Sequence, residues 1–264
     1  MSVQATPQSQ SQMENVFFEE DARRARDVVE LELIRLIEEN PDVVVLSADM
    51  GGAIPELRER HPGRYLEFGI AETNTMSVAA GLAAGGLVPY VLSMAPFGAI
   101  KCAEQIRTDL AYPRLPVRIV ARLSGLAMGF FGPSHHAVED IAITRSIAGL
   151  TVVAPSDTAS TTALLRSTAA HPGPVFIRVS AGIQSEVHAD VPDIPYGRFV
   201  PVRDGADVTV IATGTGVSAA VGAAELLAGE GVSVGILDAA YLKPLDEEAI
   251  LAAAERTGAI VTVE

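Results

Sequence analysis

The chain has 264 residues, of which 48% are hydrophobic and 20% are charged, a mixture that supports a packed core and excludes wholesale disorder. Its 19 basic and 33 acidic residues give a formal charge of -14, which argues against a nucleic-acid partner or an anionic membrane surface because both need positive charge on the protein. The single cysteine, Cys102, excludes an internal disulfide and a site built from several thiolates. No run approaches the roughly 18 consecutive apolar residues of a membrane span, and the N-terminus lacks the order of a secretory signal. We therefore expect a cytoplasmic α/β protein.

Residues 1–12 are rich in Ser and Gln, so residues 1–18 are predicted to form a disordered tail. A helix is expected to begin near Glu19 and to end before Pro41. From residue 19 to 182, short apolar runs then alternate with helical periodicity, which predicts a parallel sheet covered by helices. The expected strands are Val43–Leu46, Tyr65–Phe68, Val88–Leu92, Val117–Arg122, Thr151–Ala154 and Val175–Val179. The expected helices between them are Ala71–Ala84, Phe97–Ala111, Ala137–Ile147 and Asp157–Ala170.

Residues 183–204 contain several prolines and acids and no amphipathic period, which predicts an interdomain linker. Residues 205–264 predict a second α/β domain. Its expected elements are the strands Val208–Ala212, Val232–Leu237 and Ala259–Val263 and the helices Val217–Ala228 and Asp246–Ala254. The sequence stops at Glu264 after two and a half strand–helix units, so this second domain is expected to be incomplete.

A glycine-containing turn, Thr213–Gly216, follows the first strand of that second domain, and Asp238 ends the next strand. This pattern resembles a dinucleotide-binding fingerprint, in which glycines approach a pyrophosphate and an acid binds the ribose. The third glycine position, however, holds Ala219, and the permissive form of the pattern is common by chance. We favour a tight turn that precedes a helix.

Four separated motifs carry a resemblance to a known family. The run Glu67–Glu72, followed by Ala79–Ala83, is similar to the glycine-isoleucine-alanine-glutamate segment of transketolases and deoxyxylulose-phosphate synthases. Leu115–Arg118, Gly132–His135 and Val153–Asp157 then follow in the order of that family and at nearly its spacing. The resemblance covers about Val28 to Glu264 and implies a pyrimidine-binding α/β domain followed by a transketolase C-terminal domain.

The resemblance implies thiamine diphosphate as the cofactor. Glu72 matches the family glutamate that hydrogen-bonds the aminopyrimidine ring and thereby favours the tautomer that acts as an internal base, so it is expected to be catalytic and cofactor-binding. From the residues alone, Glu72 could equally be an acid favoured by the dipole at a helix start. Phe97 matches the aromatic residue that stacks on the aminopyrimidine, and Met94 is expected to form a softer wall of the same pocket. Asp49 occupies the position of a family aspartate near the cofactor.

His135 matches the histidine of the family's substrate-facing loop, where it is expected to bind substrate and shuttle protons. His136 is its neighbour, but two adjacent histidines do not by themselves make a metal site, and we expect no metal ligands in this chain. Arg178 resembles the arginine that grips the sugar phosphate; the alternative is a salt-bridged strand end.

Two positions depart from the family pattern. Phe131 stands where transketolases carry an acid that contacts a substrate hydroxyl, and Leu123 stands where they carry a second substrate-facing histidine. Both are still expected to line the substrate site. A site that loses polar partners for hydroxyls loses discrimination for them, so the resemblance implies a less hydroxylated or modified sugar as donor.

The chain contains no Gly-Asp-Gly sequence, the motif with which this family binds the divalent ion that anchors the diphosphate. The resemblance therefore implies the C-terminal subunit of a split transketolase that transfers a two-carbon ketol unit between sugar phosphates. An N-terminal subunit would hold the diphosphate and Mg²⁺, the two would form an α2β2 assembly, and this chain would be inactive alone. The alternatives are a regulatory scaffold and the β subunit of a 2-oxo-acid dehydrogenase; the Gly132–His135 loop favours the transketolase.

Overall fold

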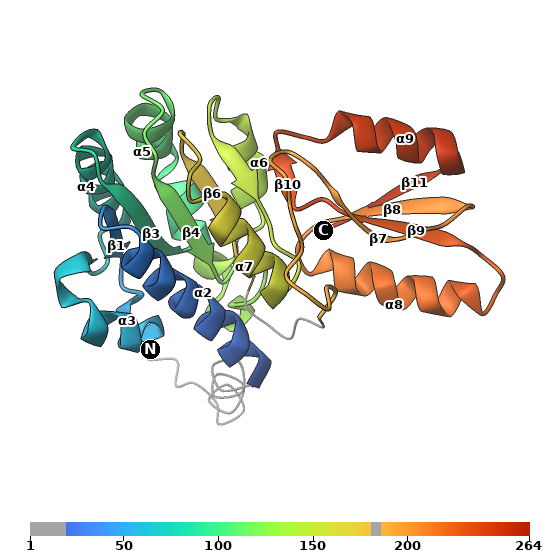
Figure 1. The fold of residues 1–264 in the computed structure, drawn as a ribbon, viewed down its shortest axis with the longest axis horizontal. Coiled ribbons are helices and arrows are strands. Elements are labelled where there is room, and N and C mark those ends of the chain that lie inside the picture. The colour runs from blue at the N-terminus through green and yellow to red at the C-terminus, as the bar shows by residue number, and fades with distance from the viewer. Residues whose placement is uncertain (1–19, 181–185) are drawn as a thin grey trace, which may run out of the picture.

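The computed structural model describes residues 20–180 and 186–264, and their side chains from residue 28 onwards. The tail expected for residues 1–18 lies outside the described residues. Within them, the strands form one sheet of seven and one of four, which lie side by side (Figure 1). No helix in the described ranges combines the length and apolar character needed to cross a bilayer.

The larger sheet confirms the expected α/β class. Its order is β10-β5-β6-β4-β3-β1-β2, and every pair is parallel except β10 with β5. The antiparallel edge strand β10 was not expected, because it comes from residues that follow the strands of the second sheet. The strands are β1 (Val43–Ser47), β2 (Tyr65–Glu67), β3 (Val88–Met94), β4 (Arg118–Arg122), β5 (Thr151–Val153), β6 (Val175–Arg178) and β10 (Tyr241–Lys243).

Helices cover both faces of this sheet (Figure 1). Alternate side chains of β1 enter different core clusters: Val43 and Val45 pack beneath α2 (Glu20–Glu39) and α7 (Thr158–Ser167), and Val44 and Leu46 pack beneath α4 (Glu72–Ala84). This division follows from the two-residue repeat of a strand. The remaining helical segments are η1 (Gly51–Ala53), α3 (Pro55–Arg60), η2 (Pro62–Arg64), η3 (Phe97–Lys101), α5 (Ala103–Gln105), η4 (Ile106–Ala111), η5 (Gly129–Phe131), η6 (Pro133–His135) and α6 (Asp140–Ser146).

The expected helix over residues 97–111 is helical, but it is not a regular α-helix. Its first part, η3, and its last part, η4, are π-helical, and the short α5 lies between them. The segment η1–α3–η2 was not expected, because its pieces are too short to show a helical period.

The smaller sheet has the order β11-β8-β9-β7, with α8 (Gly216–Ala228) and α9 (Glu247–Thr257) on opposite faces. Its strands are β7 (Val200–Arg203), β8 (Val208–Ala212), β9 (Val234–Asp238) and β11 (Ile260–Val263). Not all of the stretch expected as a linker, residues 183–204, is irregular, because β7 lies within it and pairs antiparallel with β9. Pro201 obscured this strand, yet a proline is tolerated at a sheet edge because one side of the strand makes no ladder bonds.

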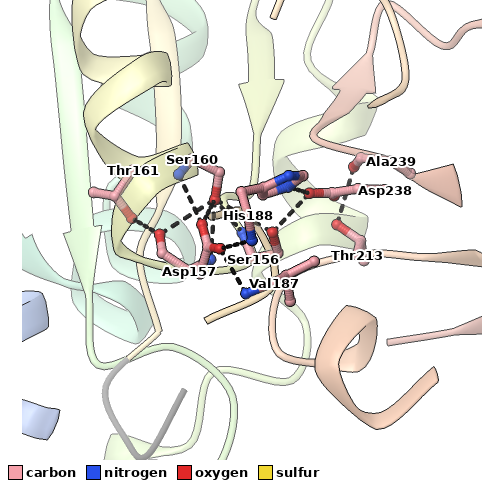
Figure 2. A network of polar contacts seen from close by, with 9 residues as sticks. All are labelled: Ser156, Asp157, Ser160, Thr161, Val187, His188, Thr213, Asp238 and Ala239. Carbon is pink, nitrogen blue, oxygen red and sulfur yellow. Dashed lines mark hydrogen bonds and ion pairs between the residues drawn. The ribbon is translucent and has the colours of Figure 1, made fainter. Parts of the chain in front are cut away.

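A network of polar contacts joins the two sheets (Figure 2). Asp157 follows β5, and its carboxylate accepts hydrogen bonds from the backbone N–H groups of Val187 and His188 at 2.9 and 2.7 Å. Asp238 ends β9, accepts a hydrogen bond of 2.6 Å from Ser156, and lies 3.2 Å from the Nε2 atom of His188. The network therefore ties the first sheet, residues 187–188 and the second sheet together.

Candidate active site

The residues expected in the site follow one edge of the larger sheet. Parallel strands bring their carboxyl ends to the same edge, which is where open α/β sheets bind ligands. Asp49 follows β1, Glu72 follows β2 after a short turn, Met94 ends β3 with Phe97 close behind it, Leu123 follows β4, and Arg178 ends β6.

Glu72 is the first residue of α4, and its side chain is only 4% exposed. Its Oε2 atom accepts a hydrogen bond from Lys101 Nζ at 2.6 Å. This bond raises the pKa of Lys101, which keeps the ammonium charged at neutral pH. The thiol of Cys102 lies next to this pair, and burial, with the Glu72 charge as a second cause, raises its pKa to about 12. Glu72 is therefore a buried carboxylate paired with one partly exposed cation.

The turn before Glu72 is fixed by a second carboxylate. Glu67 accepts hydrogen bonds from the backbone N–H groups of Asp49 and Gly69 at 3.0 and 2.8 Å and from the hydroxyl of Tyr65. Burial acts to raise the pKa of Glu67, but these hydrogen bonds outweigh it and lower the pKa. Asp49 and Gly69 both have positive φ angles, of 57° and 64°. The Glu67 carboxylate therefore links the expected cofactor residue Asp49, after β1, to the turn that precedes α4.

His135 ends η6, and its loop is closed by a backbone bridge between Gly125 and Ala137. Gly132, with a φ of 83°, separates η5 from η6 and allows the loop to reverse. The Oγ atom of Ser134 lies 3.0 Å from the Nδ1 atom of His135.

Aromatic side chains hold the imidazole ring of His135 on two sides. The ring centroid of Phe97 lies 5.2 Å away at 78°, and that of Phe131 lies 4.6 Å away at 31°. Edge and offset contacts of this kind are favoured between aromatic rings. The structure therefore brings together three of the expected site residues, Phe97, Phe131 and His135.

Arg178 is placed differently. Its Nε atom donates to Asp140 Oδ2 at 2.8 Å, its Nη2 atom lies 3.7 Å from Glu264, and its side chain is 9% exposed while that of Asp140 is fully buried. With Ser124 and Thr213 it lines a cavity of about 710 Å³. One edge of the guanidinium is thus committed to a buried ion pair, which is the salt-bridged arrangement considered as the alternative to phosphate binding.

Met94 and Leu123 are half-buried and pack against the core cluster beneath α2 and α7. Leu123 has a φ of 60°, which is unusual for a leucine and marks the bend after β4. These two expected pocket residues therefore contribute to the core of the sheet.

Asp238, the acid of the glycine-turn pattern, is fully buried and binds Ser156 and His188 rather than facing open space (Figure 2). In the described part of the chain, no group of three or more His, Cys, Asp or Glu side chains could hold a metal ion. The sequence motifs do not include Lys101, Asp140 or His188. For Lys101, the available signal was its position four residues after Phe97 on the same predicted helix.

Comparisons with known proteins identify the family of both domains. Residues 21–183 match the transketolase pyrimidine-binding domain, and residues 197–264 match the transketolase C-terminal domain. The chain is 36% identical over 234 residues to the 6-deoxy-6-sulfo-D-fructose transketolase subunit of Clostridium sp. MSTE9, covering 88% of this chain and 73% of that protein. It is 34% identical over 235 residues to one of the subunits of the apulose-4-phosphate transketolase of Phocaeicola vulgatus, covering 88% of this chain and 75% of that protein.

Among solved structures, a split-gene transketolase described as an inactive β4 tetramer has 37% identity and a TM-score of 0.84, and the match covers 91% of this chain and 79% of that one. The first match covers β1 to β6 of the larger sheet, and the second covers the four strands of the smaller sheet together with β10. The chain contains sequences that match the pyrimidine-binding domain and the C-terminal domain of transketolases, and it therefore belongs to the transketolase family.

Proposed function

We propose that this chain is the C-terminal subunit of a two-subunit, thiamine-diphosphate-dependent transketolase that transfers a two-carbon ketol unit between anionic sugars. The observation that carries the proposal is the buried carboxylate of Glu72 at the carboxyl edge of the sheet, on the edge that also carries the cluster of Phe97 and His135. Two relatives with more than two thirds of their length matched are transketolase subunits by name.

The residues of this chain suit one end of the cofactor. A buried carboxylate can hydrogen-bond a pyrimidine ring nitrogen, and the half-buried Phe97 offers an aromatic face to a heteroaromatic ring. When bound, thiamine diphosphate supplies the carbanion chemistry of ketol transfer. Glu72 would hold a proton at the ring nitrogen, Phe97 would orient the ring, and His135 would move a proton at a substrate hydroxyl.

The other end of the cofactor requires a partner. The diphosphate needs a cation or several donors to offset its charge. Among the described residues, no group of three or more His, Cys, Asp or Glu side chains could hold such a cation. The chain has no Gly-Asp-Gly sequence, and its formal charge is -14. We assign the diphosphate and Mg²⁺ to an N-terminal subunit and expect an α2β2 assembly. Ile70, Ile100 and Phe131 are 76%, 42% and 45% exposed, and apolar side chains exposed near a site are typical of a face that another subunit covers.

The donor is expected to have fewer hydroxyls to recognise than an ordinary ketose phosphate. Phe131 presents an apolar ring beside His135 where the family carries an acid, and Leu123 packs into the core where the family carries a histidine. A less hydroxylated or otherwise modified sugar that carries an anionic group fits these substitutions.

The test is two-carbon transfer by the complex of this chain with a co-expressed subunit that contains Gly-Asp-Gly, in the presence of thiamine diphosphate and Mg²⁺. Each subunit alone should be inactive. Glu72→Gln should lose most of the rate, whereas Glu255→Gln, an exposed acid on α9, should keep it. Full activity of the Glu72→Gln complex would show that the assignment of Glu72 is wrong.

A further inference from the structure

Lys101 contacts Glu72, and neither the family match nor the motifs assign a role to this contact. Its ammonium donates to Glu72 Oε2 at 2.6 Å, and its own side chain is 48% exposed while that of Glu72 is 4% exposed. Among the hydrogen bonds of the described residues, this is the one that reaches the Glu72 carboxylate. The Lys101 ammonium therefore lies nearer to the solvent, and the Glu72 carboxylate lies beneath it.

The local backbone explains why this pair forms. Phe97 is the first residue of the π-helical segment η3, and Lys101 is the last. Gly98 lets this segment approach β3 closely, because a Cβ atom there would lie 3.2 Å from the Cβ atom of Ser93. A π-helical turn is wider than an α-helical one and occurs frequently at functional sites. One short segment thus delivers both the aromatic ring and the cation to the cofactor edge.

Glu72 would be poorly held without Lys101. Its helix α4 has Ala71 at the N-cap, which gives no side-chain cap, so the carboxylate has the helix dipole and the lysine as its positive neighbours. Burying a carboxylate without a partner is costly. A carboxylate has two oxygens, and the bond to Lys101 occupies Oε2 and leaves Oε1 as an acceptor.

We propose that Lys101 is a positioning residue that fixes the Glu72 side chain through Oε2 so that Oε1 serves the pyrimidine nitrogen. This inference rests on the proposed function of Glu72. The ammonium restricts the rotamers of a flexible glutamate, which is how a neighbouring side chain preorganises a catalytic group.

The test uses the complex with the N-terminal subunit and the variants Lys101→Met, Lys101→Arg and Glu72→Gln. Lys101→Met should lower kcat about 10- to 100-fold, as small misplacements of a catalytic group do, while the KM of the sugar donor changes less than about threefold. The dissociation constant of thiamine diphosphate, measured by calorimetry, should rise.

Lys101→Arg should recover much of the rate and of the cofactor affinity, because arginine keeps a donor and the charge. If Lys101→Met keeps kcat and cofactor affinity while Glu72→Gln is inactive, the positioning role is wrong and the proposed function stands. If Lys101→Met only lowers the melting temperature, Lys101 is structural and the inference also fails. If Glu72→Gln is fully active, the proposed function fails, and the inference fails with it.

Discussion

His188 and Asp238 form a buried pair between the two sheets. Nε2 of His188 lies 3.2 Å from Oδ2 of Asp238, and the two side chains are 10% and 0% exposed. Ser156, in the turn after β5 of the first sheet, donates a hydrogen bond to the same carboxylate oxygen (Figure 2). The pair therefore connects the segment before β7, the end of β9 and the turn after β5, and its protonation is linked to the stability of the junction.

This pair should make the stability fall as pH rises. The hydrogen bond to Asp238 raises the pKa of His188 despite its burial, and burial raises the pKa of Asp238. A histidine with a raised folded pKa contributes stability that is fully present below its unfolded pKa of about 6.5 and is lost as pH rises through the folded value. The raised pKa of Asp238 acts in the same direction, because its charged form is the one that folding disfavours.

We expect the free energy of unfolding to decrease as pH rises above about 6.5, the unfolded pKa of histidine. We expect His188→Gln to flatten this dependence and to cost about 1–3 kcal/mol at pH 6. Urea denaturation across the pH range measures both effects. His136→Gln, on the loop of the candidate site, should leave the slope unchanged. Equal slopes for the wild type and His188→Gln would contradict this account.

Asp140→Asn should destabilise the protein by about 3–5 kcal/mol, the usual cost of breaking a buried ion pair on one side. The substitution leaves the buried Arg178 charge without its 2.8 Å partner. As a control, Glu248→Gln removes a carboxylate that is 79% exposed in its pair with Arg198, and solvent-exposed pairs of this kind contribute little to stability. Denaturation of the isolated chain compares the two, and similar losses would disprove the special role of Asp140.

Arg118→Met should be similarly damaging for a different reason. Arg118 is 1% exposed, and its guanidinium donates to backbone carbonyls just beyond α7 and before β4, namely those of Thr168, Ala169, His171 and Pro116. Removing the guanidinium leaves several buried carbonyl acceptors without a hydrogen bond, and each costs about 1–3 kcal/mol of folding free energy before the structure relaxes. Arg114→Met, a surface change on the preceding loop, should cost under about 0.5 kcal/mol. Comparable melting temperatures for the two variants would refute this.

Phe131→Asp should change donor preference in the assembled enzyme. An acid beside His135 would supply an acceptor for a sugar hydroxyl, so kcat/KM for an ordinary ketose phosphate should rise relative to a deoxy donor, by about 10-fold or more. Competition between the two donors measures the ratio directly. Leu126→Asp adds the same charge to the loop at a side chain that is 64% exposed and should leave the ratio unchanged. If both variants alter preference equally, the effect is one of loop charge, and Phe131 does not determine specificity.

The order of strands and helices could be predicted from the sequence because the first unit is built from parallel strands with strongly apolar runs. The position of Glu72 followed from the strand, the glycine turn and the helix start that surround it. Lys101 was missed because its contact with Glu72 depends on the π-helical path of η3. Its position four residues after Phe97 indicated a shared helix face but not this contact.

The two antiparallel edge strands were missed for related reasons. Val200–Arg203 contains Pro201, and Tyr241–Lys243 is three residues long and followed by Pro244. Short edge strands with prolines show no alternation, and only the partner strand specifies them. His188 lay in the same proline-rich stretch, where no period indicated burial.

The return of β10 to the larger sheet has a consequence for how the molecule can be taken apart. The strand that shields β5 is made from residues 241–243, which come after β9 of the other sheet. A fragment that ends at residue 180 would therefore leave one edge of β5 with unpaired backbone N–H and C=O groups, and such an edge promotes aggregation. Dividing the chain between the two sheets would therefore not give two fragments that each fold independently.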